Sequence, residues 1–189
     1  LEFPDRVVAY MTSGGKNDHG RCDFYAGRVE QEYQLLKPWL PDKVESILDI
    51  GCGLGGIDAM FGQHYGGDVQ LHLFDGQGDQ ANRVMGFQED TKAWANVLIA
   101  EELVHANVPA GTVVAAHFAD PTATVVADLI VSFKSWCHHY PASVYIDLVK
   151  RPLRPMNSWI TSYPKLMTRS EVVKFQLIKI WLSSPSRPS

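Results

Sequence analysis

The chain has 189 residues, of which 46% are hydrophobic and 20% are charged, a composition typical of one globular domain with its own core. Its formal net charge of −4 provides no overall basic field that would attract nucleic acid or an acidic membrane. The three cysteines are widely spaced and indicate neither a disulfide framework nor a zinc site, and no apolar run reaches membrane-spanning length, so we expect a cytoplasmic protein without a membrane partner.

The first helix predicted along the chain covers residues 24–40. Apolar residues recur there at helical spacing, and Pro38 and Pro41 end the pattern. Before it, the apolar run 7–10 leads into a polar loop at 12–20, whose composition is that of a mobile surface segment.

Residues 46–57 are the most informative stretch. The apolar residues at 47, 48 and 50 predict a strand buried on both faces, and glycines follow at 51, 53, 55 and 56. Glycine lets the backbone turn sharply and lets a ligand lie directly against it. The free N–H groups of a helix beginning near residues 54–57 and running to 65 would then point at that ligand. The stretch predicts a nucleotide-type binding site.

Two ligand patterns overlap in these glycines. Gly51, Gly53 and Gly56 satisfy the G-x-G-x-x-G dinucleotide pattern, whereas Asp49, Gly51, Gly53 and Gly55 satisfy the D-x-G-x-G-x-G pattern of S-adenosylmethionine (SAM) sites. A carboxylate at Asp49 would repel a pyrophosphate, but SAM has no phosphate and carries a sulfonium and an ammonium group. Asp49 therefore favours SAM over NAD.

A second acid follows at the end of the next predicted strand, 69–75. Ligands of open parallel sheets bind beyond the carboxyl ends of the strands. Asp75 lies 24 residues after Gly51, where an acid can accept hydrogen bonds from both ribose hydroxyls. A loop is expected over residues 76–91.

The remaining elements continue the alternation of helices and strands. The sequence predicts helices at 92–107 and 141–153 and strands at 112–118, 128–132 and 153–160, the last entered by a turn. Residues 172–182 are strand-like and would supply terminal antiparallel pairing, and 183–189 are expected to be disordered. The fold class is therefore α/β, with a doubly wound, mostly parallel central sheet and a shortened C-terminal antiparallel end, in a single domain over residues 1–189.

The stretch from Asp49 to Gly55 resembles the first motif of the class I SAM-dependent methyltransferases, and the resemblance extends over roughly residues 47–160. It implies a Rossmann-like fold, a region 1–45 that acts as lid and helix, and a SAM site. The residues that it assigns to SAM are Asp49, Gly51, Cys52, Gly53, Gly55, Asp75, Gly76, Asp120 and Ser132.

The loop after the fourth strand, residues 134–141, would lie beside the methyl group of SAM. It contains His138 and His139, and an imidazole near neutral pKa suits proton removal from a methyl acceptor. We expect one of the two to face the site, since adjacent residues at a strand end point to opposite sides. Helix capping or packing by these histidines is the structural alternative. His117 is expected in the interior of the third strand.

The acceptor is the open question at the level of sequence. The N/D-P-P-Y motif of amino-group methyltransferases is absent, and the loop 135–141 resembles that of small bacterial sugar methyltransferases. Our working hypothesis is an O-methyltransferase acting on a hydroxylated small molecule or saccharide. The alternatives are a SAM-binding protein without turnover, an RNA methyltransferase and an NAD-dependent oxidoreductase.

Overall fold

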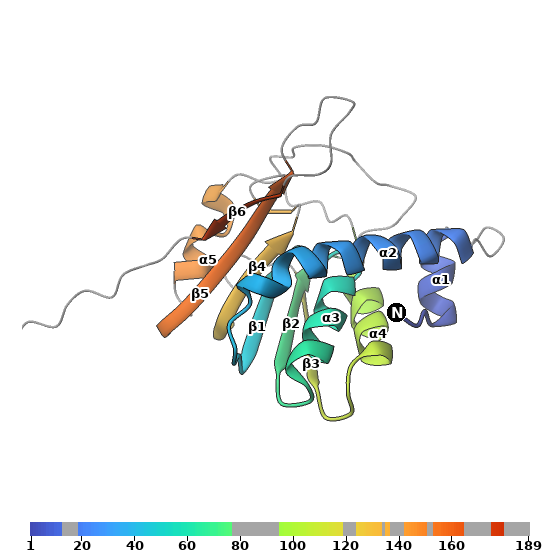
Figure 1. Cartoon of the computed structure of the whole chain (residues 1–189), viewed down its shortest axis with the longest axis horizontal. Coiled ribbons are helices and arrows are strands. Elements are labelled where there is room, and N and C mark those ends of the chain that lie inside the picture. The colour runs from blue at the N-terminus through green and yellow to red at the C-terminus, as the bar shows by residue number, and fades with distance from the viewer. Residues whose placement is uncertain are drawn as a thin grey trace, which may run out of the picture.

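The computed structural model describes residues 1–12, 19–76, 95–118, 124–133, 135–136, 142–150, 153–164 and 175–179. A six-stranded sheet with strand order β3-β2-β1-β4-β5-β6 forms its centre (Figure 1). The strands are β1 (Ser46–Ile50), β2 (Gln70–Asp75), β3 (Val113–Phe118), β4 (Ala127–Phe133), β5 (Leu153–Pro164) and β6 (Phe175–Lys179). Every neighbouring pair is parallel except β5 and β6. The predicted sheet with an antiparallel C-terminal edge is confirmed.

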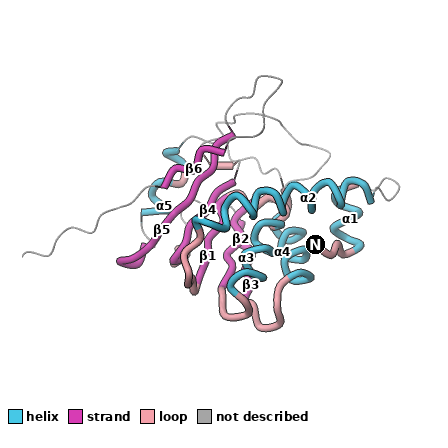
Figure 2. The backbone as a smooth tube through the Cα atoms, in the orientation of Figure 1, coloured by secondary structure: helices cyan, strands magenta, loops and turns pink. Residues whose placement is uncertain are grey.

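The helices are α1 (Asp5–Met11), α2 (His19–Leu36), α3 (Gly56–Tyr65), α4 (Val97–Asn107) and α5 (Ile146–Lys150), with short 3-10 helices at Lys37–Trp39 and Ala142–Val144. A helix follows each of β1 and β2, and α5 precedes β5, whereas no helix is described between β3 and β4 or between β5 and β6 (Figure 2). The long helix α2 runs across the front of the sheet in Figure 1, where α3 and α4 also lie.

Successive residues of β1 supply the cores on the two faces of the sheet. Ile47 packs with side chains of α2, α3 and α4, whereas Leu48 and Ile50 pack with residues of and next to α5. All five residues of β1 are buried. This burial explains why the strand is apolar except for Ser46 at its start and Asp49.

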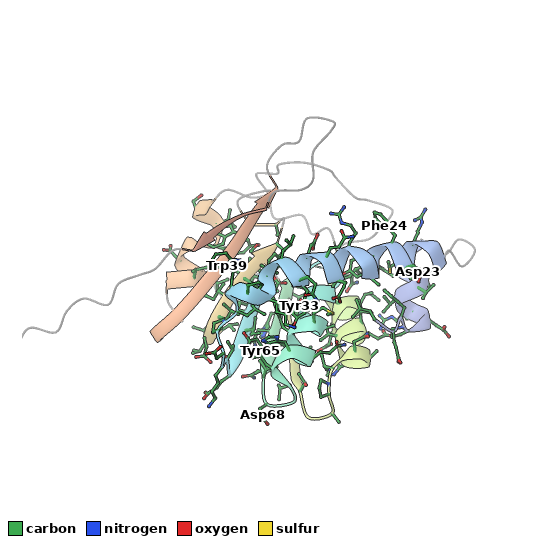
Figure 3. The ribbon with its side chains drawn as sticks, in the orientation of Figure 1. Asp23, Phe24, Tyr33, Trp39, Tyr65 and Asp68 are labelled. Carbon is green, nitrogen blue, oxygen red and sulfur yellow. The ribbon has the colours of Figure 1, made fainter. Side chains whose placement is uncertain are left out.

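Two tyrosines that Figure 3 labels fasten α3 to helix α2 and to the segment between α2 and β1. The Tyr33 hydroxyl lies 2.7 Å from His64 Nδ1, and the Tyr65 hydroxyl donates to the carbonyl of Pro41 at 2.9 Å. These contacts hold the segment before β1 against the helix that follows the glycine turn.

Several element bounds differ from those predicted. The apolar run 7–10 belongs to helix α1, and its Val7 is fully buried against α4. Helix α2 begins at His19, before the predicted residue 24, and ends at Leu36. Pro38 belongs to the 3-10 helix that follows. Helix α5 is shorter than predicted.

The turn expected before the fifth strand is part of β5 itself. Ala127 pairs with Leu153 and Leu129 with Ser158, so β4 advances two residues while β5 advances five. The chain absorbs residues 154–157 as an irregularity within the strand. Without the two glycines that the methyltransferase pattern would place at 156 and 157, this segment stays extended.

The connection from β3 to β4 covers only residues 119–126, fewer than the dozen or so of a usual parallel crossover. Val125, near its end, is buried against Leu48, Phe74 and Ile130. Val125 therefore belongs to the core on the α5 face of the sheet.

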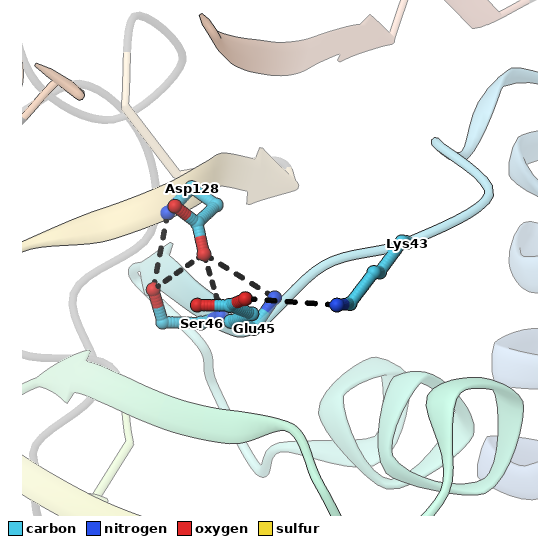
Figure 4. A network of polar contacts seen from close by, with 4 residues as sticks. All are labelled: Lys43, Glu45, Ser46 and Asp128. Atoms are coloured by element: carbon cyan, nitrogen blue, oxygen red, sulfur yellow. Dashed lines mark hydrogen bonds and ion pairs between the residues drawn. The ribbon is translucent and has the colours of Figure 1, made fainter. Parts of the chain in front are cut away.

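At the amino ends of β1 and β4, a polar network joins the two strands (Figure 4). Asp128 Oδ2 accepts hydrogen bonds from the N–H groups of Glu45 and Ser46 and from the Ser46 hydroxyl, at 3.1–3.2 Å. Ser46 Oγ in turn accepts from the Asp128 N–H at 3.1 Å. The network sets the starting points of two central strands.

Candidate functional site

The glycine turn begins where β1 ends, against the last residues of β2. The N–H groups of Gly51 and Cys52 both donate to the carbonyl of Phe74, at 2.6 and 3.3 Å. Gly51 has φ of 76°, and a Cβ there would collide with the side chain of Ser135. Only glycine satisfies both the dihedral angle and the space at this position.

Gly53 and Gly55 also have positive φ, but their surroundings differ. Gly55 caps the N-terminus of α3, and a Cβ on it would come within 2.7 Å of Val104 Cγ2. A Cβ on Gly53 would meet nothing within 4 Å, among the residues that the structure describes. Gly53 is therefore the point of the turn beside which there is space for a ligand.

Asp75, at the carboxyl end of β2, faces the same turn. Its Oδ2 accepts the Gly53 N–H at 2.8 Å, and its Oδ1 accepts the Gly76 N–H at 2.7 Å. Burial raises the pKa of this carboxyl to about 6, against the lowering effect of these N–H groups. An ionised carboxylate has about four acceptor positions, so two remain for ligand hydroxyls.

Gly76 links this acid to helix α4. Its carbonyl accepts the Val97 N–H at 3.0 Å, and the Asn96 side chain caps the same helix by accepting the Leu98 N–H at 3.0 Å. The hydrogen bond between Gly76 and Val97 holds the start of α4 next to the end of β2.

Asp49 lies on the β1 face that meets α3, and it is 1% exposed. Its carboxyl is a side-chain hydrogen-bond partner of Asp58, which is in the first turn of α3 and is also 1% exposed. Burial, above all, raises the pKa of both carboxyls. The pairing with Asp58 is a feature that sequence reasoning missed, because nothing local links residues 49 and 58.

Ser132 and Cys52, two more of the residues assigned to SAM, are both buried next to the glycine turn. Ser132 is buried, and its hydroxyl donates to the Ile50 carbonyl at 2.7 Å and accepts the Trp136 N–H at 3.0 Å. The Cys52 thiol is buried, and burial raises its pKa well above the ordinary value. It is therefore a protonated thiol at neutral pH and no nucleophile.

Ser132 also positions the loop in which the catalytic histidines are expected. By holding both Ile50 and Trp136, it brings the start of that loop against the glycine turn. His138 and His139 themselves, and Asp120, lie outside the described residues.

Tyr25 of α2 is a second contact that sequence reasoning missed. Its hydroxyl accepts the Gly56 N–H at 3.1 Å, at the N-terminus of α3. Helical spacing marked Tyr25 only as a packing residue, and no sequence signal reports this hydrogen bond.

His117 lies within β3, as expected, and is half-buried. Its Nε2 is 3.0 Å from Nδ1 of His72 on β2, and burial lowers the pKa of both imidazoles.

In the part of the chain that the structure describes, no three His, Cys, Asp or Glu side chains gather as metal ligands, and no helix is long and apolar enough to span a bilayer.

No protein-family model matches the sequence, and neither does any curated protein. Solved structures do match the fold. The StiE O-MT (residues 961–1257) aligns at a TM-score of 0.55 with 15% identity, over 85% of this chain and 51% of that one. A cyclopropane-fatty-acyl-phospholipid synthase-like protein from Lactobacillus casei aligns at 0.54 with 18% identity, over 88% and 60%.

A third match is coclaurine N-methyltransferase bound to N-methylheliamine and SAH, with a TM-score of 0.50 and 13% identity over 71% of this chain and 35% of that one. The chain thus spans between about a third and three fifths of these three structures. The chain therefore shares its α/β fold with solved methyltransferase structures, as the sequence predicted.

Proposed function

We propose that this chain transfers a methyl group from SAM to a hydroxyl group of a small molecule or saccharide. The observation that carries the proposal is the glycine turn at the end of β1, which has space beside Gly53 and the Asp75 carboxylate hydrogen-bonded across it. The fold shared with O- and N-methyltransferases supports it.

The residues of the turn fit SAM in their chemistry. Asp75 has acceptor positions left for the two ribose hydroxyls, and Gly53 allows the ligand to approach the backbone closely. The acid at Asp49 suits the two cationic groups of SAM and opposes a pyrophosphate. Asp120 is proposed to bind the adenine amino group, as the methyltransferase resemblance implies.

SAM supplies an activated methyl group with a good leaving group already attached. The chain therefore has to hold the acceptor in line with the methyl group, exclude water and take up the acceptor proton. We assign the proton uptake to His138 or His139, in the loop whose start at Trp136 is hydrogen-bonded to Ser132. Unchanged turnover in both His138→Ala and His139→Ala would remove the general base from the proposal.

Calorimetric titration with SAM, S-adenosylhomocysteine and NAD tests the cofactor directly. We expect the two adenosyl ligands to bind and Asp75→Ala to weaken them about 10- to 100-fold, since a hydrogen bond to a charged group contributes about 1.5–3 kcal/mol. Asp68→Ala, an exposed acid in the turn before β2 (Figure 3), should bind as the unmodified protein does. Binding of NAD alone would refute SAM as the cofactor.

A second candidate function is SAM binding without turnover. It is favoured by the path of β5: Met156 and Asn157 stand where the methyltransferase pattern has two glycines, and both residues lie inside the strand, at an end of the chain from which acceptor pockets often take residues. Tight SAM binding with no methyl transfer to a broad panel of hydroxylated acceptors would support this candidate.

The net charge of −4 argues for a small acceptor over RNA. Retention on RNA that weakens steeply with salt would reverse that choice.

A further inference from the structure

We propose that Asp58 acts with Asp49 as a proton-holding pair, which gives up one proton to solvent when the amino-acid part of the cofactor binds. Asp58 is then a positioning residue: it acts on the cofactor through Asp49. The inference rests on the proposed function and concerns how that same site selects a cationic ligand.

The geometry of the pair requires a proton. Both side chains are 1% exposed and are hydrogen-bond partners of each other. Among the described residues, no group outside the pair donates to Asp49 Oδ1 or to either carboxyl oxygen of Asp58. Two ionised carboxylates have only acceptors to offer, so their contact forms when one of them is protonated.

The groups facing the pair reinforce this requirement. They are Asp75 from β2, Cys52 from the turn and Tyr25 from α2, and each is an acid. Within the described ranges, no cation acts on either carboxyl. The N-terminus of α3 favours one negative charge in its first turn, but it does not compensate two.

A ligand cation can replace this proton. The pair adjoins the turn that has open space at Gly53, and its buried oxygens have no other hydrogen-bond donor. An ammonium group next to Asp49 stabilises the doubly ionised pair, so the carboxylic O–H bond breaks and its proton passes to the buffer. The ammonium keeps its own proton, and no bond to the cofactor forms.

The first experiment uses the unmodified protein and compares two ligands. S-adenosylhomocysteine and 5′-methylthioadenosine share adenosine and the sulfur atom, but only the former carries an ammonium and a carboxylate. Calorimetry at pH 7 in two buffers with different ionisation enthalpies measures the protons released. We expect about one proton more with S-adenosylhomocysteine than with 5′-methylthioadenosine, and any release through Asp75 is common to both ligands.

The second experiment removes the proton from the pair. In Asp58→Asn the side-chain amide donates to Asp49 and keeps it ionised. We expect S-adenosylhomocysteine to bind without the extra proton release and with an affinity that stays flat above about pH 7, where Asp75 no longer titrates. In the unmodified protein the affinity should rise about tenfold per pH unit while the pair is protonated. Asp68→Asn is the matched control and should keep the release.

The outcomes separate the two proposals. If S-adenosylhomocysteine binds to the unmodified protein without extra proton release, the proton-holding role of Asp49 and Asp58 is refuted. The proposed function is then unaffected. The same release in Asp58→Asn would overturn the role of Asp58. A protein that binds neither ligand would overturn both proposals. If Asp58→Asn does not fold, the comparison of the two ligands still decides.

Discussion

At the start of β4 the Asp128 carboxylate accepts three hydrogen bonds, whereas near the opposite end of the neighbouring strand the Asp49 carboxyl meets another acid. Asp128 is half-buried and Asp49 is 1% exposed, so the more buried acid has the poorer partners. Buried polar groups are normally satisfied, and exceptions concentrate where function requires them. The difference agrees with the proposed function, in which the carboxyl ends of the strands bind the cofactor while the amino ends stabilise the sheet.

The largest loss of stability is expected when a methyl group is added at Gly51, at the carboxyl end of β1. Gly51→Ala combines a left-handed φ with a collision against Ser135, and we expect a loss of about 2–5 kcal/mol in the free energy of unfolding. Gly53→Ala has the same kind of φ but open space, so its loss should be about 1–2 kcal/mol. Urea denaturation of both variants measures the difference, and equal losses would contradict the geometry.

At the amino end, Asp128→Ala should cost about 2–3 kcal/mol in the free energy of unfolding. It leaves the N–H groups of Glu45 and Ser46 without their shared acceptor at the start of β1. The affinity for S-adenosylhomocysteine should not change, since Asp128 belongs to the opposite end of the sheet. A calorimetric titration that shows weakened binding would mean that the two ends are not independent.

Asp58→Asn is expected to raise the free energy of unfolding, in contrast to the substitutions above. A carboxyl whose pKa is raised on folding loses stability as pH rises from about 4, the unfolded value, through its folded value. The amide abolishes that loss, so we expect the variant to gain about 1–3 kcal/mol in the free energy of unfolding near pH 8. The fall in the free energy of unfolding between about pH 4 and 6 should remain in the variant, because the Asp75 carboxyl titrates in that range.

Parallel urea titrations of Asp58→Asn and the unmodified protein at pH 6 and pH 8 check this sign. A variant less stable at both values would show that the acid pair holds the glycine turn together.

The smallest effect is expected at Lys43, which forms an ion pair with Glu45 at 3.7 Å at the edge of the Asp128 network (Figure 4). Both side chains are largely exposed, so Lys43→Ala should change the free energy of unfolding by less than about 0.5 kcal/mol. Thermal unfolding at low and high salt measures this change in stability. A larger change would mean that Lys43 contributes to the Asp128 network at the start of β1.

The sequence predicted what local pattern encodes. The apolar run of β1, the glycines of the turn and the alternating residues of β2 each fall within a few positions, so their elements and the place of Asp75 followed from them. Helix α1 was missed because its burial depends on α4, about a hundred residues away. The pairing of Asp49 with Asp58, and the Tyr25 hydroxyl on Gly56, depend on how α3 and α2 dock. The extended path of β5 follows from its pairing with β4.

The position of β1 between β2 and β4 also bears on how the chain reaches this structure during synthesis. The strands β1, β2 and β3 and the helices between them are consecutive, but β4 pairs with β1 only after residues 127–133 have been made. Until then one edge of β1, with apolar side chains on both faces, has no partner strand. An unpaired apolar edge invites association with other chains. We therefore expect fragments that end before residue 127 to aggregate, and we expect the addition of β4 to cover this edge of β1.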